Sequence, residues 1–91
     1  MSPMLGFAFS AQALASLKDI PVRFRKQIVA KAESLLKTPA PPGSKKLRAV
    51  MDGDDAVYRI RSGDYRILYV VRQNPEQIVV IDIGHRKDVY R

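Results

Sequence analysis

The stretch YRIRSGDYRILYVV, residues 58–71, predicts two β-strands joined by a tight turn. Both arms are rich in β-branched and aromatic residues, and residues 62–64 supply the turn chemistry between them. Side chains alternate between the two faces of a strand, so Ile60 falls on one face while Arg59 and Arg61 fall on the other. An arginine in mid-strand is costly to bury without a partner, so we expect one face of this hairpin to meet water or a ligand.

The same alternation predicts two very different faces for the whole sheet, whose last strand we expect over residues 77–84. The face expected to pack on helices is apolar and holds Tyr58, Ile60, Ile67, Tyr69, Val79, Ile81 and Ile83. The opposite face is expected to gather arginines from separate strands, namely Arg59, Arg61 and Arg66, with Arg86 just past the last strand. Apolar side chains among them would form an exposed patch of the kind that marks a protein partner, made of Val57, Leu68, Val70, Ile78 and Val80. Because guanidinium binds phosphate oxygens in a bidentate fork, this face predicts a phosphate site beside a docking surface. The alternative is that the arginines are ordinary solvated residues of a basic sheet, one of them paired with Asp82 on the same face.

The rest of the chain predicts a first strand, two helices and a strand before the hairpin. Residues 5–9 indicate a first strand, Ser10 a helix N-cap and residues 11–18 a helix. A second, amphipathic helix is expected over residues 22–37, and the Pro-rich segment 38–44 is expected to be a loop. Further expectations are a strand at 45–50 and turns at 51–55 and 73–76. This order predicts an α+β fold, with the N-terminal strand and a helical hairpin on one face of a mostly antiparallel sheet of four to five strands.

Length and composition exclude several classes of protein. The 91 residues suffice for one domain, 1–91, and the absence of cysteine excludes disulfides and thiol catalysis. The aspartates of residues 52–55 lack the spacing and the glutamate of a calcium loop, so we expect no metal site. No apolar run approaches the ~20 residues of a membrane span, and no secretion signal is evident. The formal net charge of +7 can attract polyanions. By itself it fits an ordinary solvated basic surface as well as a nucleic acid, an anionic membrane surface or an acidic protein as partner.

Four segments together resemble the RelE/ParE superfamily of toxins from toxin–antitoxin modules: KLR at 46–48, YRIR at 58–61, GDYRILY at 63–69 and GHRKDVY at 84–90. The resemblance covers nearly the whole chain, including the order of elements. It implies a RelE-like fold and, for the RelE branch, an endoribonuclease without metal or cofactor that cleaves mRNA in the ribosomal A site. In that reaction the 2′-hydroxyl attacks the adjacent phosphorus, which leaves a cyclic phosphate and a free 5′-hydroxyl.

The resemblance also implies roles for individual residues. The catalytic set that it implies is Arg59, Arg61, Arg66, Arg86 and Tyr90. Neighbouring basic residues expected to bind RNA are Lys45, Lys46, Arg48 and Lys87. The best-known RelE pattern has lysines at the positions of Arg59 and Arg61, and since guanidinium hardly ever loses its proton, charge stabilisation would survive this change better than base catalysis. His85 is a candidate acid or base, but alternation turns it toward the core unless the strand ends at Gly84, which favours a structural role.

The resemblance further implies a small, acidic, RelB-like antitoxin that wraps the toxin in a hetero-oligomer and covers Val57, Leu68, Val70 and Val80. It also implies contact with mRNA and ribosomal RNA in the 30S A site, in the cytoplasm of a bacterium or archaeon, with no membrane. Two alternatives stay open. One is a ParE-like toxin that poisons DNA gyrase, although that branch generally lacks the full basic set. The other is a degenerate, non-catalytic toxin kept as a binding module.

Overall fold

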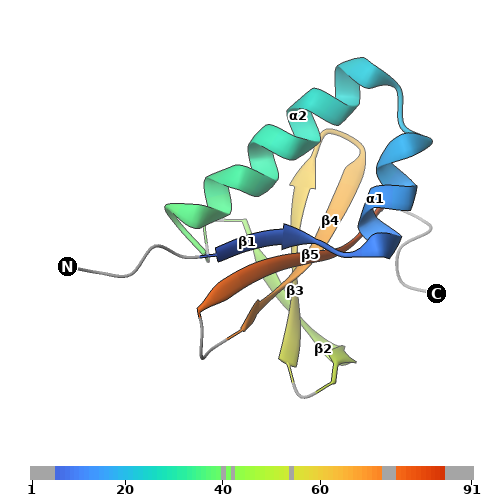
Figure 1. Ribbon diagram of the computed structural model, residues 1–91. Coiled ribbons are helices and arrows are strands. Elements are labelled where there is room, and N and C mark those ends of the chain that lie inside the picture. The colour runs from blue at the N-terminus through green and yellow to red at the C-terminus, as the bar shows by residue number, and fades with distance from the viewer. Residues whose placement is uncertain (1–5, 40, 42, 54, 73–75, 86–91) are drawn as a thin grey trace.

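The computed structural model describes residues 6–39, 41, 43–53, 55–72 and 76–85, with the backbone alone for residues 48–52. Over these residues the elements are β1 (Gly6–Phe9), α1 (Ala11–Lys18), α2 (Val22–Glu33), the short 3₁₀ helix η1 (Ser34–Leu36), β2 (Lys45–Asp52), β3 (Asp55–Ser62), β4 (Tyr65–Arg72) and β5 (Gln77–His85). The strands of this described part form one sheet in the order β1-β5-β4-β3-β2, in which β1 runs parallel to β5 and the other neighbours are antiparallel. The predicted α+β class is confirmed (Figure 1).

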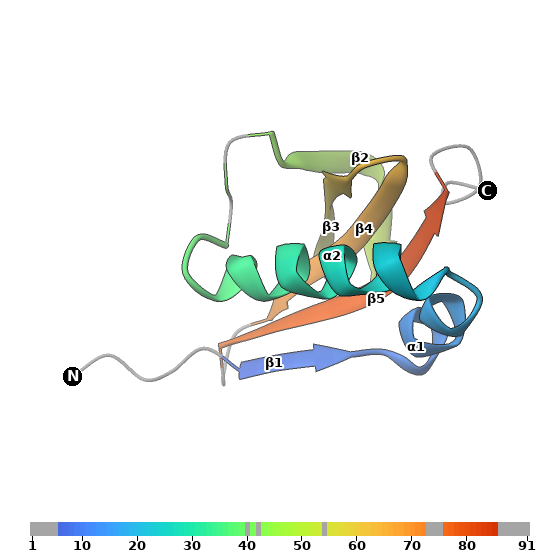
Figure 2. The same ribbon diagram turned by 90° about the horizontal axis from the view of Figure 1, so that it is seen from above.

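The two helices occupy different places on the sheet. α2 lies across one face, whereas α1 lies at the end of β1, beside the second half of β5 (Figures 1 and 2). The predicted N-cap is confirmed, since the Ser10 hydroxyl accepts a hydrogen bond from the Ala13 N–H at 3.0 Å. α2 ends at Glu33 instead of residue 37, because the chain tightens into η1, and this leaves Leu36 38% exposed.

The main hydrophobic core lies between α2 and the sheet. Ile28 and Leu35 of the helical layer meet Ile60, Ile67 and Tyr69 of the hairpin, and all five are at most 2% exposed. The other buried members are Ala13, Leu17, Ile20, Ala32, Ile78, Val80 and Ile83. The expected inward face of the hairpin is thus confirmed.

The expected faces of β5 are wrong over residues 78–81. Ile78 and Val80 pack in the core under α2, while Val79 and Ile81 face the opposite side of the sheet. The cause is a β-bulge: Leu68 pairs with Asp82 but the next residue, Tyr69, pairs with Val80. One extra residue on β5 shifts the alternation of everything before it by one position.

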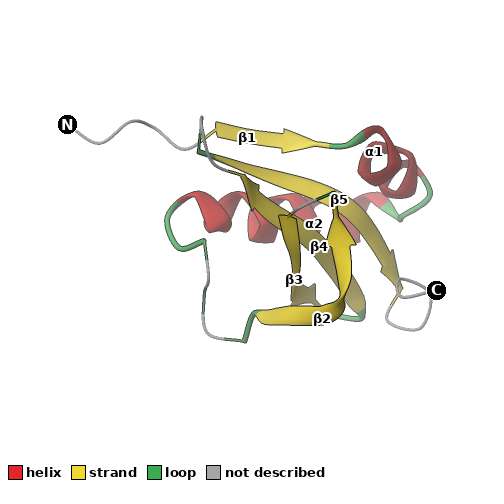
Figure 3. Cartoon of the chain, turned by 90° about the horizontal axis from the view of Figure 1, so that it is seen from below, coloured by secondary structure: helices red, strands yellow, loops and turns green. Residues whose placement is uncertain are grey.

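The face of the sheet away from α2 carries a second, smaller apolar cluster, which we call the outer cluster. It consists of Val57, Leu68, Val70 and Val79, with Leu47 and Ile81 packed against them. No described helix covers this face (Figure 3). β2 bends there, where its pairing with β3 shifts between Leu47 and Met51, and Leu47 lies opposite Val57.

Candidate functional site

Arginines meet on the outer face at the end of the β3–β4 hairpin. Arg61 and Arg66 are directly opposite each other on β3 and β4, so their side chains project from the same face. The next position in this row is Gly84 of β5, which has no side chain and leaves the surface beside Arg66 open. Two like charges side by side are unfavourable on their own and favourable around an anion.

A second row of the same face adds two more cations. Arg59 of β3 is opposite Lys45 of β2 on one side and Leu68 of β4 on the other. The Arg59 Nε is buried and has no hydrogen-bond partner among the described residues, so this guanidinium is held against the sheet. The row ends at Asp82, whose Oδ1 accepts hydrogen bonds from the Ile83 N–H at 2.8 Å and the Ser16 hydroxyl at 3.3 Å. That carboxylate is therefore engaged by α1 and by its own strand.

A cavity of about 70 Å³ opens at the tip of the hairpin. Its walls are Arg61 and Arg66 together with residues of the turn, Gly63, Asp64 and Tyr65. Gly63 has a φ of 58°, in the left-handed region that favours glycine, and this lets the chain reverse tightly between the two arginine-bearing strands. The turn thus fixes the two guanidinium groups on either side of a hollow of the size of a small anion.

Not all of the predicted basic residues share this face. Lys45 does, but Lys46 pairs with Tyr58 and so projects on the α2 side. Only the backbone of Arg48 is described, within β2. Arg86, Lys87 and Tyr90 lie outside the described residues, so their predicted roles stay predictions.

His85 projects from the other face of the sheet. It is the last residue of β5, pairs with Tyr65, and lies edge-on to the Tyr65 ring with 5.9 Å between ring centroids. Because Tyr65 packs against the core under α2, His85 is on the α2 side of the sheet, away from Arg61 and Arg66. Its predicted part as acid or base in the arginine site is not supported by this position.

The predicted exposed patch is corrected in two ways. Val57, Leu68 and Val70 do lie on the arginine face, but they are buried, with 0%, 4% and 0% exposure. Val80 lies on the opposite face, in the core under α2. The reason is that the bulge reverses the β5 alternation and the bent β2 brings Leu47 onto the cluster.

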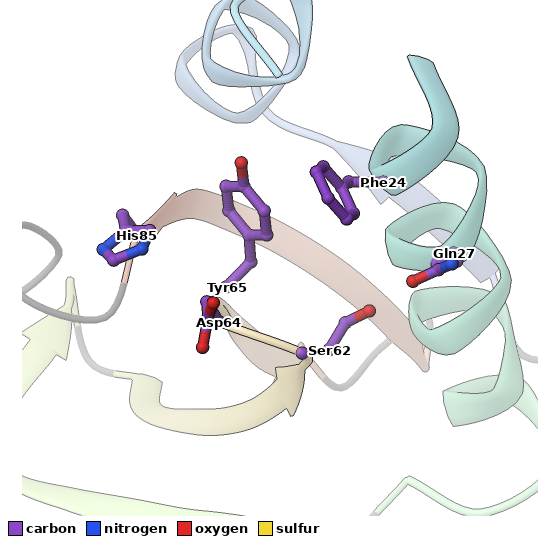
Figure 4. Close-up of a pocket in the computed structure, with 7 residues that line it drawn as sticks. Phe24, Gln27, Ser62, Asp64, Tyr65 and His85 are labelled. Carbon is purple, nitrogen blue, oxygen red and sulfur yellow. The ribbon is translucent and has the colours of Figure 1, made fainter. Parts of the chain in front are cut away.

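A second pocket, which the sequence did not indicate, lies on the α2 side of the same hairpin (Figure 4). It has a volume of about 210 Å³ and is lined by Phe24, Gln27, Ser62, Gly63, Asp64, Tyr65 and His85. Phe24 and Tyr65 pack against the core under α2 and also line this hollow. We call this hollow the aromatic pocket.

Among the described residues, no group of three or more acidic or histidine side chains could hold a metal ion. None of the helices described is long and apolar enough to cross a membrane.

Comparisons with known proteins agree with one another. The family model described as the ParE toxin of the type II toxin–antitoxin system parDE matches residues 7–90. A Methanocaldococcus jannaschii protein named toxin RelE1 is 31% identical over 80 residues, 88% of this chain and 88% of that protein. A chain of the toxin–antitoxin complex RelBE2 from Mycobacterium tuberculosis is 27% identical with a TM-score of 0.75, and the match covers 92% of this chain and 93% of that one. A chain of the archaeal RelE–RelB complex from Pyrococcus horikoshii has a TM-score of 0.76 over 96% of this chain and 100% of its own length, and at 23% identity it shows the fold.

Proposed function

The chain belongs to the RelE/ParE superfamily of toxins from type II toxin–antitoxin systems, and we propose that it is a ribosome-dependent mRNA endonuclease that cuts in the A site. The observation that carries this proposal is the set of cations on one face of the sheet. Lys45, Arg59, Arg61 and Arg66 come from three adjacent strands and project from the same side. Such a face can hold a phosphodiester and stabilise the extra negative charge of its transition state.

In the proposed reaction the RNA supplies its own nucleophile. The 2′-hydroxyl attacks the adjacent phosphorus, the bond to the 5′-oxygen breaks, and the products are a 2′,3′-cyclic phosphate and a 5′-hydroxyl. Arg61 and Arg66, on the two sides of the small cavity, would hold the phosphoryl oxygens and keep the nucleophile in line with the leaving group. A guanidinium holds its proton throughout the physiological range, so these residues act by charge and position. Arg86 and Tyr90, from the resemblance, complete the proposed set.

We further propose that a small acidic antitoxin of the RelB type neutralises this protein in the cytoplasm. The solved relative from M. tuberculosis, which is 27% identical to this chain, is the toxin–antitoxin complex RelBE2. The net charge of +7 favours an acidic partner. Because Val57, Leu68 and Val70 are buried, this partner would meet the cations around the outer cluster before it met the cluster itself.

The test is a cleavage assay with purified protein, purified ribosomes and a defined mRNA whose new ends are mapped. We expect cuts within the A-site codon, with a cyclic phosphate upstream and a 5′-hydroxyl downstream, and no cuts without ribosomes. Arg66→Ala and Arg86→Ala should each abolish cutting, whereas Lys26→Ala, which removes the same charge from the exposed face of α2, should not. Intact mRNA on programmed ribosomes would overturn the proposal.

One observation favours a second candidate, a ParE-like toxin that poisons DNA gyrase, since the matching family model is described as a ParE toxin. Induction in cells separates the two, because an endonuclease stops protein synthesis first and a gyrase poison stops DNA replication first. Normal growth after induction would instead identify a degenerate toxin that acts as a binding module.

A further inference from the structure

The aromatic pocket lies on the opposite side of the hairpin tip from the arginine site. Its walls come from α2, which contributes Phe24 and Gln27, from the end of β3, from the turn, and from the end of β5 (Figure 4). Its volume of about 210 Å³ gives room for a planar group of one or two rings.

Ring faces and edges dominate one side of this pocket. Tyr65 stands between His85 and Phe24 (Figure 4), with centroid separations of 5.9 Å and 5.8 Å. The Phe24 and Tyr65 rings are tilted by 44° to each other, so they do not stack face to face, and both rings line the pocket. Aromatic side chains with open faces are the platforms on which unpaired nucleobases stack.

Polar groups stand where a base would need them. The side chains of Gln27 and Ser62 point toward each other across the pocket, and Asp64 lies at the foot of Tyr65 (Figure 4). A carboxylate accepts hydrogen bonds from the N–H edge of a base, and guanine offers two adjacent N–H donors. The Arg23 guanidinium lies over the Phe24 ring, 4.7 Å from its centre, and adds a positive charge beside that wall of the pocket.

The turn joins this pocket to the arginine site. Gly63, Asp64 and Tyr65 line both the aromatic pocket and the small cavity between Arg61 and Arg66. An RNA strand that crosses the tip of the hairpin could therefore leave a phosphate on one side of the turn and a base on the other.

We propose that the aromatic pocket binds an unpaired nucleobase, guanine best, next to the phosphate held by Arg61 and Arg66, and so makes cleavage selective for sequence. This rests on the proposed endonuclease function. Phe24 and Tyr65 stack on the base, and Asp64 accepts hydrogen bonds from its edge. Gln27 and Ser62 form hydrogen bonds with its remaining polar atoms. The arginine site grips any nucleotide through its phosphate, and the aromatic pocket supplies the choice among bases.

Binding is tested first without ribosomes, by NMR titration of the purified protein with GMP, AMP and ribose 5-phosphate. His85 is the only histidine, so its imidazole protons form a resolved reporter beside Tyr65. We expect GMP to shift the His85 and Tyr65 ring signals more than AMP does, and ribose 5-phosphate to leave them unmoved. Phe24→Leu, which keeps an apolar side chain, should weaken GMP binding at least about fivefold. Equal shifts with GMP and ribose 5-phosphate would overturn the proposal.

Selectivity is tested next, by mapping cuts over a library of A-site codons. Asp64→Asn should reduce the preference for guanine-containing sites over other sites about tenfold. Glu76→Gln, the same change of charge at an exposed position in another turn, is the matched control and should keep the wild-type profile. If the wild type cuts and Asp64→Asn cuts with the same profile, the pocket proposal fails and the endonuclease stands. If the wild type does not cut but GMP still shifts His85, the endonuclease fails and the pocket still binds a base.

Discussion

The two faces of the sheet bury side chains to the same degree and for different ends. Under α2, aliphatic and aromatic residues from two helices and four strands form a broad core. On the other face, four valine and leucine side chains are equally buried, yet Arg59, Arg61 and Arg66 project among and beyond them. The difference teaches that the outer cluster is a support for charged side chains, because its members lie in the same strands as the three arginines and hold those strands at fixed spacing.

Loss of one exposed arginine should change activity far more than stability. We expect Arg61→Ala to reduce A-site cleavage by about 100-fold to 1,000-fold, the usual effect of removing one group that stabilises transition-state charge. The same change should raise the free energy of unfolding by about 0.5 kcal/mol, because Arg61 lies directly opposite Arg66 and their repulsion is relieved. Cleavage kinetics and urea unfolding of one preparation measure both. A parallel loss of stability would show that Arg61 belongs to the scaffold.

Truncation inside each cluster should reveal how much each face contributes to folding. Ile28 of α2 and Val70 of β4 are both 0% exposed, one in each cluster. We expect Ile28→Ala to lower the free energy of unfolding by about 3 kcal/mol and Val70→Ala by about 2 kcal/mol, since the valine loses fewer methylene equivalents. Chemical denaturation gives both values. A cost below about 0.5 kcal/mol for Val70→Ala would mean that the outer cluster is covered without being packed.

Sequence patterns located the hairpin face correctly and the last strand incorrectly, for a physical reason. In β3 and β4 a charged residue alternates with an apolar one, so the burial of Ile60 and Ile67 also determines the direction of Arg59, Arg61 and Arg66. In β5 the run of residues 78–81 is apolar throughout, and both faces of the sheet accept such residues. Nothing in that run marks the bulge opposite Leu68 and Tyr69, which depends on pairing between strands.

The candidate site, like the sheet, was predictable only in part. The three hairpin arginines could be placed from alternation alone, and so could the inward direction of His85. The aromatic pocket could not, because it depends on how α2 crosses the hairpin tip, and helix periodicity shows only that Phe24 faces inward. The burial of Val57 and Val70 also escaped prediction, because it depends on packing between strands, with Leu47 of β2 and Ile81 of β5 against the cluster.

The bulge that separates the faces has its own anchor in Ser10. Its hydroxyl donates to the Ile81 carbonyl at 2.8 Å, and its N–H donates to the Val80 carbonyl at 2.8 Å, while it also caps α1. We expect Ser10→Ala to lower the free energy of unfolding by about 1.5 kcal/mol, since the helix loses its cap and the part-buried Ile81 carbonyl loses the hydroxyl that donates to it. Ser16→Ala, whose hydroxyl makes one long hydrogen bond to Asp82, should cost about 0.5 kcal/mol. Equal costs for the two variants would remove Ser10 from this role.

A single hydroxyl in the core under α2 should have a smaller effect than the Ser10 hydroxyl. Tyr69 is fully buried and donates a hydrogen bond to the Pro39 carbonyl at 2.7 Å, so Tyr69→Phe should cost about 1 kcal/mol at neutral pH. Burial raises the pKa of Tyr69 above its ordinary value of 10.0, an effect that a hydrogen bond with Ser44 partly offsets. A group whose pKa is higher in the folded state than in the unfolded state contributes its full stabilisation of the fold below the unfolded-state pKa. That stabilisation is lost as the pH rises through the folded-state pKa. The difference in free energy of unfolding between the wild type and Tyr69→Phe should therefore stay constant up to about pH 9 and narrow above pH 10. Urea unfolding over this pH range measures it. Tyr65→Phe is the control for the loss of a half-buried tyrosine hydroxyl. A gap that widens above pH 10 would show that the ionised Tyr69 is accommodated, and that this face of the sheet is wetter than its packing indicates.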